Sequence, residues 1–507
     1  MSNQSNTKRI ARNTLMLYFR QILIMAVSLY TVRIVLNVLG AEDYGIYNVV
    51  AGVVTMFGFL SGAMATASQR YFSFDLGKGD TENLKKTFSV TLAIYALLAL
   101  FIVLLAETVG LWFVYNKLVI PSERLTAAKW IYQAAVASFL FTLITTPYMS
   151  AIIAHENMDV YAYVGIVEVA LKLGIVFLLK VLTFDKLILY GFLLLCVAVI
   201  NTSLYRFYCK KKYEECHFCL LWDGKLFKEI FTYTGWNTFG AAVGTFKFQL
   251  VNILLNQYFS PVLIAARGIA NQVNSAVSSF AMNFSNAVRP QIIKLYAAEQ
   301  KREMLDFMFK TSRYTFYLMF LLAAPLFFEM KTILGLWLKV IPEYTVLFTQ
   351  LLLIDVIIDS ISYSLGVGVQ ATGNIKWYQI IVGGLLLLNL PTSWIFLSFG
   401  FSPSIVFIIG IIITIIAFLC RLFFLKQLFS FSLRESFVIQ NLGRMLLSVA
   451  IIVPSLLCIH YFLKNIFFVL PLFLQYFCEC LLILIVGFSA TERNRFFMFI
   501  RNKINGK

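Results

Sequence analysis

Apolar residues run along this chain in long stretches that short polar segments separate. A bilayer core needs about 20 apolar residues per helix. The stretches that meet this length each predict one membrane-spanning helix: 13–39, 44–67, 88–114, 129–151, 160–180, 187–208, 230–257, 261–288, 312–336, 344–371, 375–398, 402–420, 441–462 and 466–489. The pattern therefore predicts an all-α polytopic membrane protein with about 14 transmembrane helices.

The composition agrees with this interpretation. The 507 residues are 60% hydrophobic and 13% charged, whereas a soluble domain carries about 25% charged residues. The first apolar stretch is also longer than the core of a signal peptide, which has about 7–15 residues, and no small-residue cleavage site follows it. We therefore expect a retained first helix.

The 42 Lys and Arg residues exceed the 25 Asp and Glu residues, for a net charge of +17. The basic residues form short clusters between apolar stretches instead of one patch, which indicates membrane topology and not nucleic-acid binding. When the N-terminus is placed inside, most of them fall in internal segments. We therefore expect both termini in the cytoplasm and only short external loops.

Two parts of the chain are similar to each other, as in transporters built from repeats. The second stretch carries Gly45-Ile46 and the eighth carries Gly268-Ile269 near its start, and each is followed by an amphipathic segment that ends in a Phe. We predict two parallel six-helix lobes. The predicted domains are an N-lobe at 1–208, a cytoplasmic linker at 209–228, a C-lobe at 229–425, and two further helices with a basic cytoplasmic tail at 426–507.

Polar side chains lie along one face of the eighth stretch, at helical spacing. They are Arg267, Asn271, Asn274, Ser278, Ser285 and Arg289. A polar stripe in lipid must face water or a polar partner. It lines either a hydrated cleft between the lobes, together with stretches one, two and seven, or a packing contact between helices.

The seventh stretch carries its own polar stripe, which consists of Thr238, Thr245, Gln249, Asn252 and Asn256. Lys247 lies nine residues before Asn256 and points away from this stripe. Either Lys247 is paired within its lobe, or the stripe packs and Lys247 faces the cavity.

Asp355 and Asp359 share one face at the middle of the tenth stretch, and this face continues through Ser362, Gly366 and Gln370. Two close carboxylates in a low dielectric do not both ionise freely. The pair is therefore either a cation or proton site that couples transport to an ion gradient, or a counter-charge for Lys247 or Arg267.

The chain carries few residues suited to catalysis. It has no GxxxxGK[ST] phosphate loop, and its three histidines are scattered. Cys209, Cys216, His217 and Cys219 lie in one basic segment, but we interpret them as reduced cytoplasmic thiols and not as a zinc site. We expect a transporter with no metal and no cofactor.

Four short motifs resemble the flippases of bacterial polysaccharide and O-antigen export. They are Leu39-Gly40-Ala41-Glu42-Asp43-Tyr44-Gly45-Ile46-Tyr47, Ser68-Gln69-Arg70, Ala266-Arg267-Gly268-Ile269-Ala270 and Gln370-Ala371-Thr372-Gly373. These flippases belong to the superfamily of multidrug, oligosaccharidyl-lipid and polysaccharide exporters. The resemblance implies a MATE-like fold of two six-helix lobes plus a terminal helix pair.

The resemblance also implies the cargo, a polyprenyl-pyrophosphate-linked oligosaccharide moved from the inner to the outer leaflet of the bacterial cytoplasmic membrane by alternating access. It implies membrane lipid, a polysaccharide polymerase and glycosyltransferases as partners, and no nucleic acid. The candidate substrate-binding residues are Arg20, Arg33, Arg70, Lys247, Arg267, Asn271 and Asn274. The alternatives are a cation-coupled multidrug antiporter of the same superfamily, or a membrane polysaccharide polymerase or ligase.

Overall fold

The computed structural model describes most of the chain. The described residues are 3–55, 57–116, 118, 120–182, 184–217, 223–259, 261–338, 340–431, 441–463, 469–490 and 492–494. Cys219, parts of the predicted linker and of the last predicted domain, and most of the predicted basic tail lie outside these residues.

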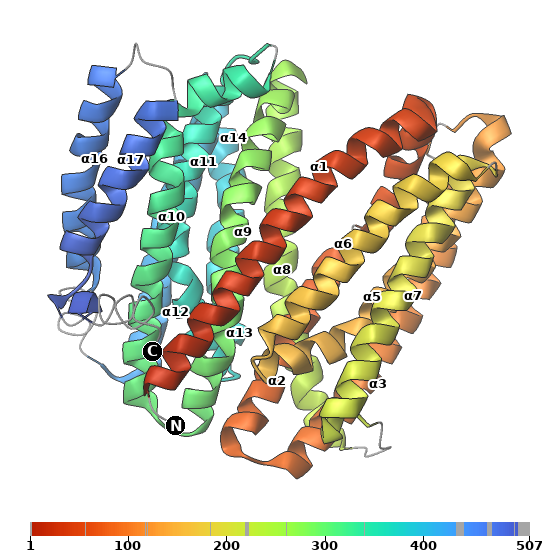
Figure 1. The fold of residues 1–507 in the computed structure, drawn as a ribbon, viewed down its shortest axis with the longest axis horizontal. Helices are drawn as coiled ribbons and strands as arrows, with labels where there is room; N and C mark the ends of the chain where they lie inside the picture. Colours follow the sequence, from red (N-terminus) through yellow and green to blue (C-terminus); the bar gives the residue numbers. More distant parts are fainter. Residues whose placement is uncertain are drawn as a thin grey trace. The chain divides into compact units, whose positions relative to one another are not determined.

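Helices account for nearly all of this described part (Figure 1). They are α1 (Asn3–Thr55), α2 (Gly58–Lys78), α3 (Thr81–Leu105), α4 (Leu111–Asn116), α5 (Leu125–Ala154), α6 (Met158–Val181), α7 (Lys186–Lys212), α8 (Gly224–Tyr258), α9 (Pro261–Ala297), α10 (Lys301–Trp337), α11 (Thr345–Ser360), α12 (Ser362–Ala371), α13 (Lys376–Leu387), α14 (Asn389–Ser398), α15 (Ile405–Phe429), α16 (Gly443–Leu463) and α17 (Val469–Leu482).

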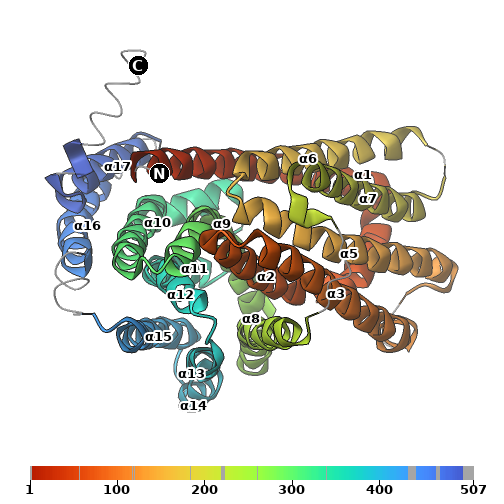
Figure 2. The same cartoon turned by 90° about the horizontal axis from the view of Figure 1, so that it is seen from below.

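The helices form two compact units. Unit 1 comprises Met1–Ala242, Asn286–Glu299 and Gly373–Lys376, and unit 2 comprises Val243–Ser285, Gln300–Thr372 and Trp377–Lys507. In unit 1, helices α1, α2, α3, α6 and α7 pack on α5. In unit 2, α11 packs on α10 and α15, while α16 and α17 pack on each other and on α10 (Figure 2). The predicted lobe boundaries stay a prediction.

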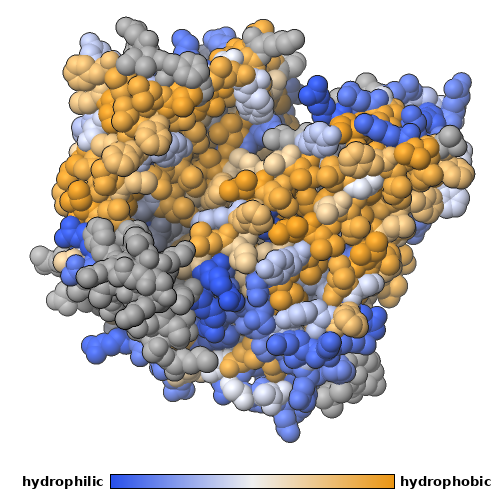
Figure 3. All heavy atoms as spheres, viewed as in Figure 1, coloured by the Kyte–Doolittle hydropathy of each residue, from blue (hydrophilic) through white to orange (hydrophobic). Residues whose placement is uncertain are grey.

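The outer surfaces of the helices are apolar. Phe207, Phe399 and Phe462 are 71%, 77% and 78% exposed, and many other large apolar side chains are exposed as well. Figure 3 shows hydrophobic residues over the sides of the helices and hydrophilic residues toward their ends. Hydrocarbon is the environment that suits such a surface, because in water it would be a large exposed apolar patch.

The described helices match the predicted spans. Eleven are long and apolar enough to cross a membrane, and thirteen stretches qualify when each of two bent helix pairs counts as one span. The predicted stretch at 261–288 lies in α9, which is 37 residues long but too polar to be among them. The prediction of an all-α polytopic fold with about 14 membrane helices is confirmed.

Two of the predicted spans are bent. Glu42–Val54 and Gly58–Lys78 meet at 46°, and α11 meets α12 at 40°. The expected continuous face from Asp355 to Gln370 is therefore wrong, because the chain turns at Ile361. The freed carbonyl of Ile361 accepts a hydrogen bond of 2.6 Å from the Ser312 hydroxyl on α10, which satisfies the broken end of α11.

An ion-pair cluster ties three helix ends together in unit 1. Arg124, just before α5, donates hydrogen bonds to Asp43 on α1 and to Asp185, which caps the N-terminus of α7. Burial raises the pKa of Asp185, but hydrogen bonds from the α7 backbone and from Arg124 outweigh burial and hold this pKa below its usual range. These contacts fix the relative positions of α1, α5 and α7 at one end.

Candidate functional site

Arg267 lies in the second turn of α9, and its side chain packs against α8. The residue is only 6% exposed. Its guanidinium donates to the side chain of Asn252 and, over 3.4 Å, to the carbonyl of Phe248, whose ring centre lies 5.0 Å away. These partners are neutral, and no carboxylate of a described residue offsets the charge. Within the described part of the chain, Arg267 is thus a buried cation without a counter-ion.

Asn271 and Asn274 follow Arg267 along the same helix. The Asn271 amide donates a 2.9 Å hydrogen bond to the carbonyl of Arg267 and is therefore used within its own helix. The side-chain oxygen of Asn274 is buried and has no hydrogen-bond partner among the described residues. Of the two amides, Asn274 has the acceptor that is not yet used.

Asp355 and Asp359 lie in the last turns of α11, just before the bend. One oxygen of Asp355 is buried without a partner among the described residues, and the carboxylate is hydrogen-bonded to Thr414. Asp359 forms an ion pair of 3.4 Å with Arg421 on α15. The last carbonyls of a helix carry partial negative charge, so this end of α11 attracts cations.

Lys247 lies on α8 in the same unit and is half-buried. It attracts the Asp355 carboxylate electrostatically. Asn252 of the same helix instead accepts the hydrogen bond from Arg267. Both alternatives for Lys247, a partner within its lobe and a place in the cavity, therefore stay predictions, as does its role in transport.

The two arginines of α1 have different surroundings in unit 1. The Arg20 guanidinium lies 4.3 Å from the centre of the Tyr161 ring on α6. Gly165, one turn further along α6, leaves the space, because a Cβ atom there would overlap Nε of Arg20. Arg33 is exposed on α1. Arg20 is therefore fixed by packing, and Arg33 is the accessible arginine of the two.

Arg70 lies near the C-terminal end of α2 and is 5% exposed. Three aromatic rings surround its guanidinium, those of Tyr71 at 4.4 Å, Phe74 at 4.9 Å and Tyr233 at 5.6 Å. The carboxylate of Glu229 on α8 lies 4.0 Å away. Arg70 is therefore held rigidly inside unit 1 by cation–π contacts and one loose ion pair.

The sequence did not single out two groups that the structure brings together. Arg421 lies one residue beyond the predicted span at 402–420, so its place beside Asp359 was missed, although a longer helix would have included it. Glu156, in the turn between α5 and α6, pairs with Arg9 at 2.8 Å and with Lys294 at 2.7 Å. No sequence pattern predicts this cluster, because Arg9, Glu156 and Lys294 are far apart along the chain.

No family model and no curated protein matches the chain. It is similar in structure to an outward-facing multidrug resistance MATE family transporter of the MOP superfamily, with a TM-score of 0.72 and 12% identity over 83% of this chain and 96% of that one. A MATE structure in the bent conformation gives a TM-score of 0.73 at 11% identity, over 83% and 96% of the two chains. A mutant of the Vibrio cholerae MATE transporter VcmN gives 0.66 at 16% identity, over 85% and 98%. The predicted MATE-like fold is thereby confirmed: the chain is folded as MATE transporters are.

Proposed function

We propose that this protein exports a polyprenyl-pyrophosphate-linked oligosaccharide, such as an O-antigen, capsule or exopolysaccharide repeat unit. The observation that carries this proposal is Arg267, a guanidinium that is 6% exposed and has no carboxylate partner among the described residues. An arginine stays charged at any physiological pH, and an isolated buried charge is costly. A pyrophosphate that crosses hydrocarbon needs a counter-charge, and Arg binds phosphate oxygens in bidentate geometry.

The cargo would move from the inner to the outer leaflet of the bacterial cytoplasmic membrane by alternating access, with both termini of the chain in the cytoplasm. The similarity to MATE transporters supports transport and not catalysis. Glycosyltransferases would supply the lipid-linked glycan, and a polymerase would consume it. A proton or sodium gradient would drive the cycle through Asp355, which has one oxygen without a partner among the described residues and is the candidate ion ligand.

The alternative is a cation-coupled multidrug antiporter, and two observations favour it. A multidrug resistance transporter is among the matched structures, and Asp355 and Asp359 provide acidic groups inside unit 2. A cationic drug needs negative charge, however, and Arg421 already pairs with Asp359. The remaining carboxylate, Asp355, is the one that we assign to ion coupling. The two functions therefore differ in the charge of the cargo.

Deletion of the gene tests the proposal. We expect lipid-linked oligosaccharide to accumulate on the inner leaflet, and mass spectrometry of the extracted lipids would identify its glycan. Complementation with the wild-type gene should clear it, whereas an R267Q variant at equal abundance in the membrane should not. A deletion strain with normal lipid-linked glycans but increased sensitivity to cationic drugs would establish the antiporter instead.

A further inference from the structure

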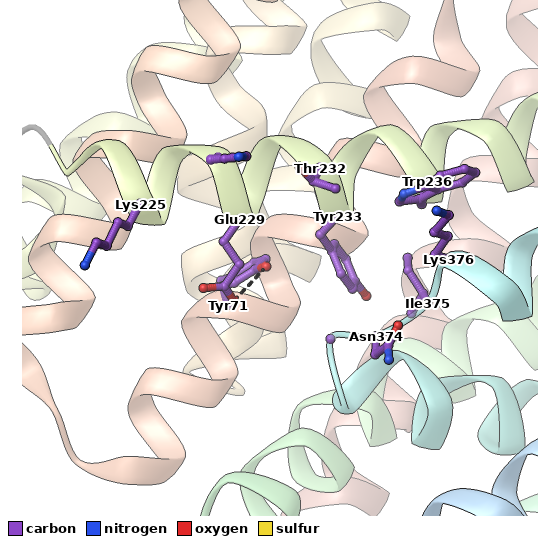
Figure 4. Close-up of a pocket in the computed structure, with 11 residues that line it drawn as sticks. Tyr71, Lys225, Glu229, Thr232, Tyr233, Trp236, Asn374, Ile375 and Lys376 are labelled. Carbon is purple, nitrogen blue, oxygen red and sulfur yellow. Dashed lines mark hydrogen bonds between the residues drawn. The ribbon is translucent and has the colours of Figure 1, made fainter.

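Unit 1 contains a cavity of about 490 Å³ at the helix ends predicted to be cytoplasmic. Three segments form it: Tyr71 in the second half of α2, the first half of α8, and the turn at Gly373–Lys376 that leads into α13. Figure 4 shows the side chains of α8 above the turn, with Tyr71 of α2 at one side. Its volume suits a small ligand, because ligand pockets hold about 300–1,000 Å³.

Basic side chains dominate the charge of this cavity. Lys225 and Lys228, three residues apart on α8, and Lys376 on the opposite wall all line it. Among the described residues that line it, one carries a carboxylate: Glu229, which accepts a 3.2 Å hydrogen bond from the Tyr71 hydroxyl and lies 4.0 Å from Arg70. Arg70 thus partly offsets the acid, and the three ammonium groups leave the cavity with a net positive charge.

Aromatic rings line the same cavity. Tyr71 and Tyr233 meet edge to face with ring centres 5.6 Å apart, and the Lys376 ammonium lies 5.6 Å from the centre of the Trp236 ring. Rings with polar tips present both an apolar face and a hydrogen-bonding edge. A sugar ring has the same two characters, with C–H groups on its faces and hydroxyls at its rim.

A glycine allows the turn at Gly373–Lys376 to pack closely against Arg70 of α2. Gly373 has φ +81°, and a Cβ atom there would lie 2.6 Å from Nη2 of Arg70. Only a residue without a side chain lets this backbone lie directly on the guanidinium. Because three rings also hold Arg70, the wall that carries Lys376 is fixed against α2 before any ligand arrives.

We propose that this cavity binds the phosphate-linked first sugar of the cargo at the cytoplasmic end of unit 1, an assignment that rests on the proposed function. Lys376, beside the Trp236 ring, contacts the phosphate oxygens through charge-assisted hydrogen bonds, Lys225 and Lys228 add to the positive charge that attracts the phosphate, and the sugar stacks on the ring of Trp236. The ligand class is a sugar phosphate. This site is separate from Arg267, since every residue that lines it belongs to unit 1.

Isothermal titration of the purified full-length protein in nanodiscs tests the site, with glucose 1-phosphate and inorganic pyrophosphate as soluble probes. The K225Q/K228Q/K376Q variant should bind both at least about tenfold more weakly, a loss of about 1.4 kcal/mol. The control K210Q/K211Q/K212Q makes the same charge change on exposed lysines at the end of α7. A Trp236→Leu variant should weaken the sugar phosphate and leave pyrophosphate unchanged.

Equal binding by the two triple variants would overturn the site, and equal losses of both probes in Trp236→Leu would overturn the sugar contact. A prenyl-phosphate-linked glucose incorporated into the nanodisc distinguishes the source of the ligand. We expect it to compete with glucose 1-phosphate, and failure to compete would overturn the assignment to the cargo. Because binding is measured apart from export, a protein that binds sugar phosphate but exports no glycolipid would refute the proposed function and leave the site intact.

Discussion

Glu156 should contribute strongly to the stability of unit 1, and the E156Q substitution tests this contribution. Its side chain is fully buried, where it pairs with Arg9 of α1 and Lys294 of α9. Its carbonyl also accepts a 2.9 Å hydrogen bond from the Asn13 amide. One residue in a turn therefore holds two helices that are more than 100 residues away in sequence. The amide of Gln keeps the shape and removes the charge.

The expected loss of stability in E156Q comes from the charges of Arg9 and Lys294, which lose their carboxylate partner. Removal of one partner from a buried ion pair costs about 3–5 kcal/mol. The side chains of Arg9 and Lys294 are 35% and 23% exposed, so we take the lower end, about 3 kcal/mol. At about 2–4 °C per kcal/mol for a large domain, the apparent melting temperature should fall by roughly 6 °C or more.

The loss of melting temperature in E156Q should also depend on pH. Burial lowers the pKa of Lys294, and the Glu156 carboxylate opposes this shift. In E156Q the pKa of Lys294 should fall further, so the buried ammonium loses its proton as the pH rises, and its penalty disappears. The difference in melting temperature between E156Q and the wild type should therefore narrow from pH 7 to about pH 10.

Thermal unfolding of the detergent-solubilised protein, followed by intrinsic fluorescence, measures both effects. E299Q is the matched control, because Glu299 also has a left-handed backbone, with φ 59° against 62° for Glu156, but is exposed. E299Q should melt with the wild type. If E156Q does so too at pH 7, or if its deficit widens at alkaline pH, the anchor assigned to Glu156 is refuted.

Three further changes probe other parts of the chain. The D355N/D359N variant should insert normally and lose the dependence of transport on a proton or sodium gradient, and unchanged ion dependence in reconstituted vesicles would reduce the pair to counter-charges. Burial raises the pKa of Glu215, but hydrogen bonds from His155 and the backbone outweigh it and lower the pKa. Its contribution to stability is thus present above about pH 4 and lost below, and H155Q should cancel this acid-dependent part of the melting temperature. Glu479→Leu should leave the melting temperature unchanged or raise it, because that carboxyl is 0% exposed with no hydrogen-bond partner among the described residues; a large drop would show that it has a partner.

The sequence was sufficient to predict the spans but not their breaks. Long apolar runs report directly on the helices, since hydrocarbon permits few other structures. The bend at Ile361 has no such signal: the residues on both sides are apolar or small, and no proline or glycine marks the turn. A helix break that a hydroxyl from another helix stabilises depends on tertiary contact, and periodicity along one segment cannot reveal it.

In the candidate site, too, the sequence predicts positions along a helix but not the contacts between helices. Helical spacing predicts that Asn252 and Lys247 lie on different faces of α8, yet it cannot say which helix each face meets. In the structure, Asn252 accepts a hydrogen bond from Arg267 of α9. Ion pairs between distant segments, such as Arg421 with Asp359, depend on how the helices pack. No local sequence pattern predicts them.

The two candidate functions differ in the charge of the cargo, and flipping in reconstituted vesicles distinguishes them. Purified protein would be incorporated into liposomes that contain a prenyl-pyrophosphate-linked sugar, and a membrane-impermeant reagent would report the fraction in the outer leaflet with time. Efflux of a cationic dye would be followed in parallel. We predict that the wild type flips the glycolipid, that R267Q does not while melting as the wild type does, and that neither moves the dye. Ion-driven dye efflux without glycolipid flipping would contradict the proposed glycolipid export and establish a cation antiporter.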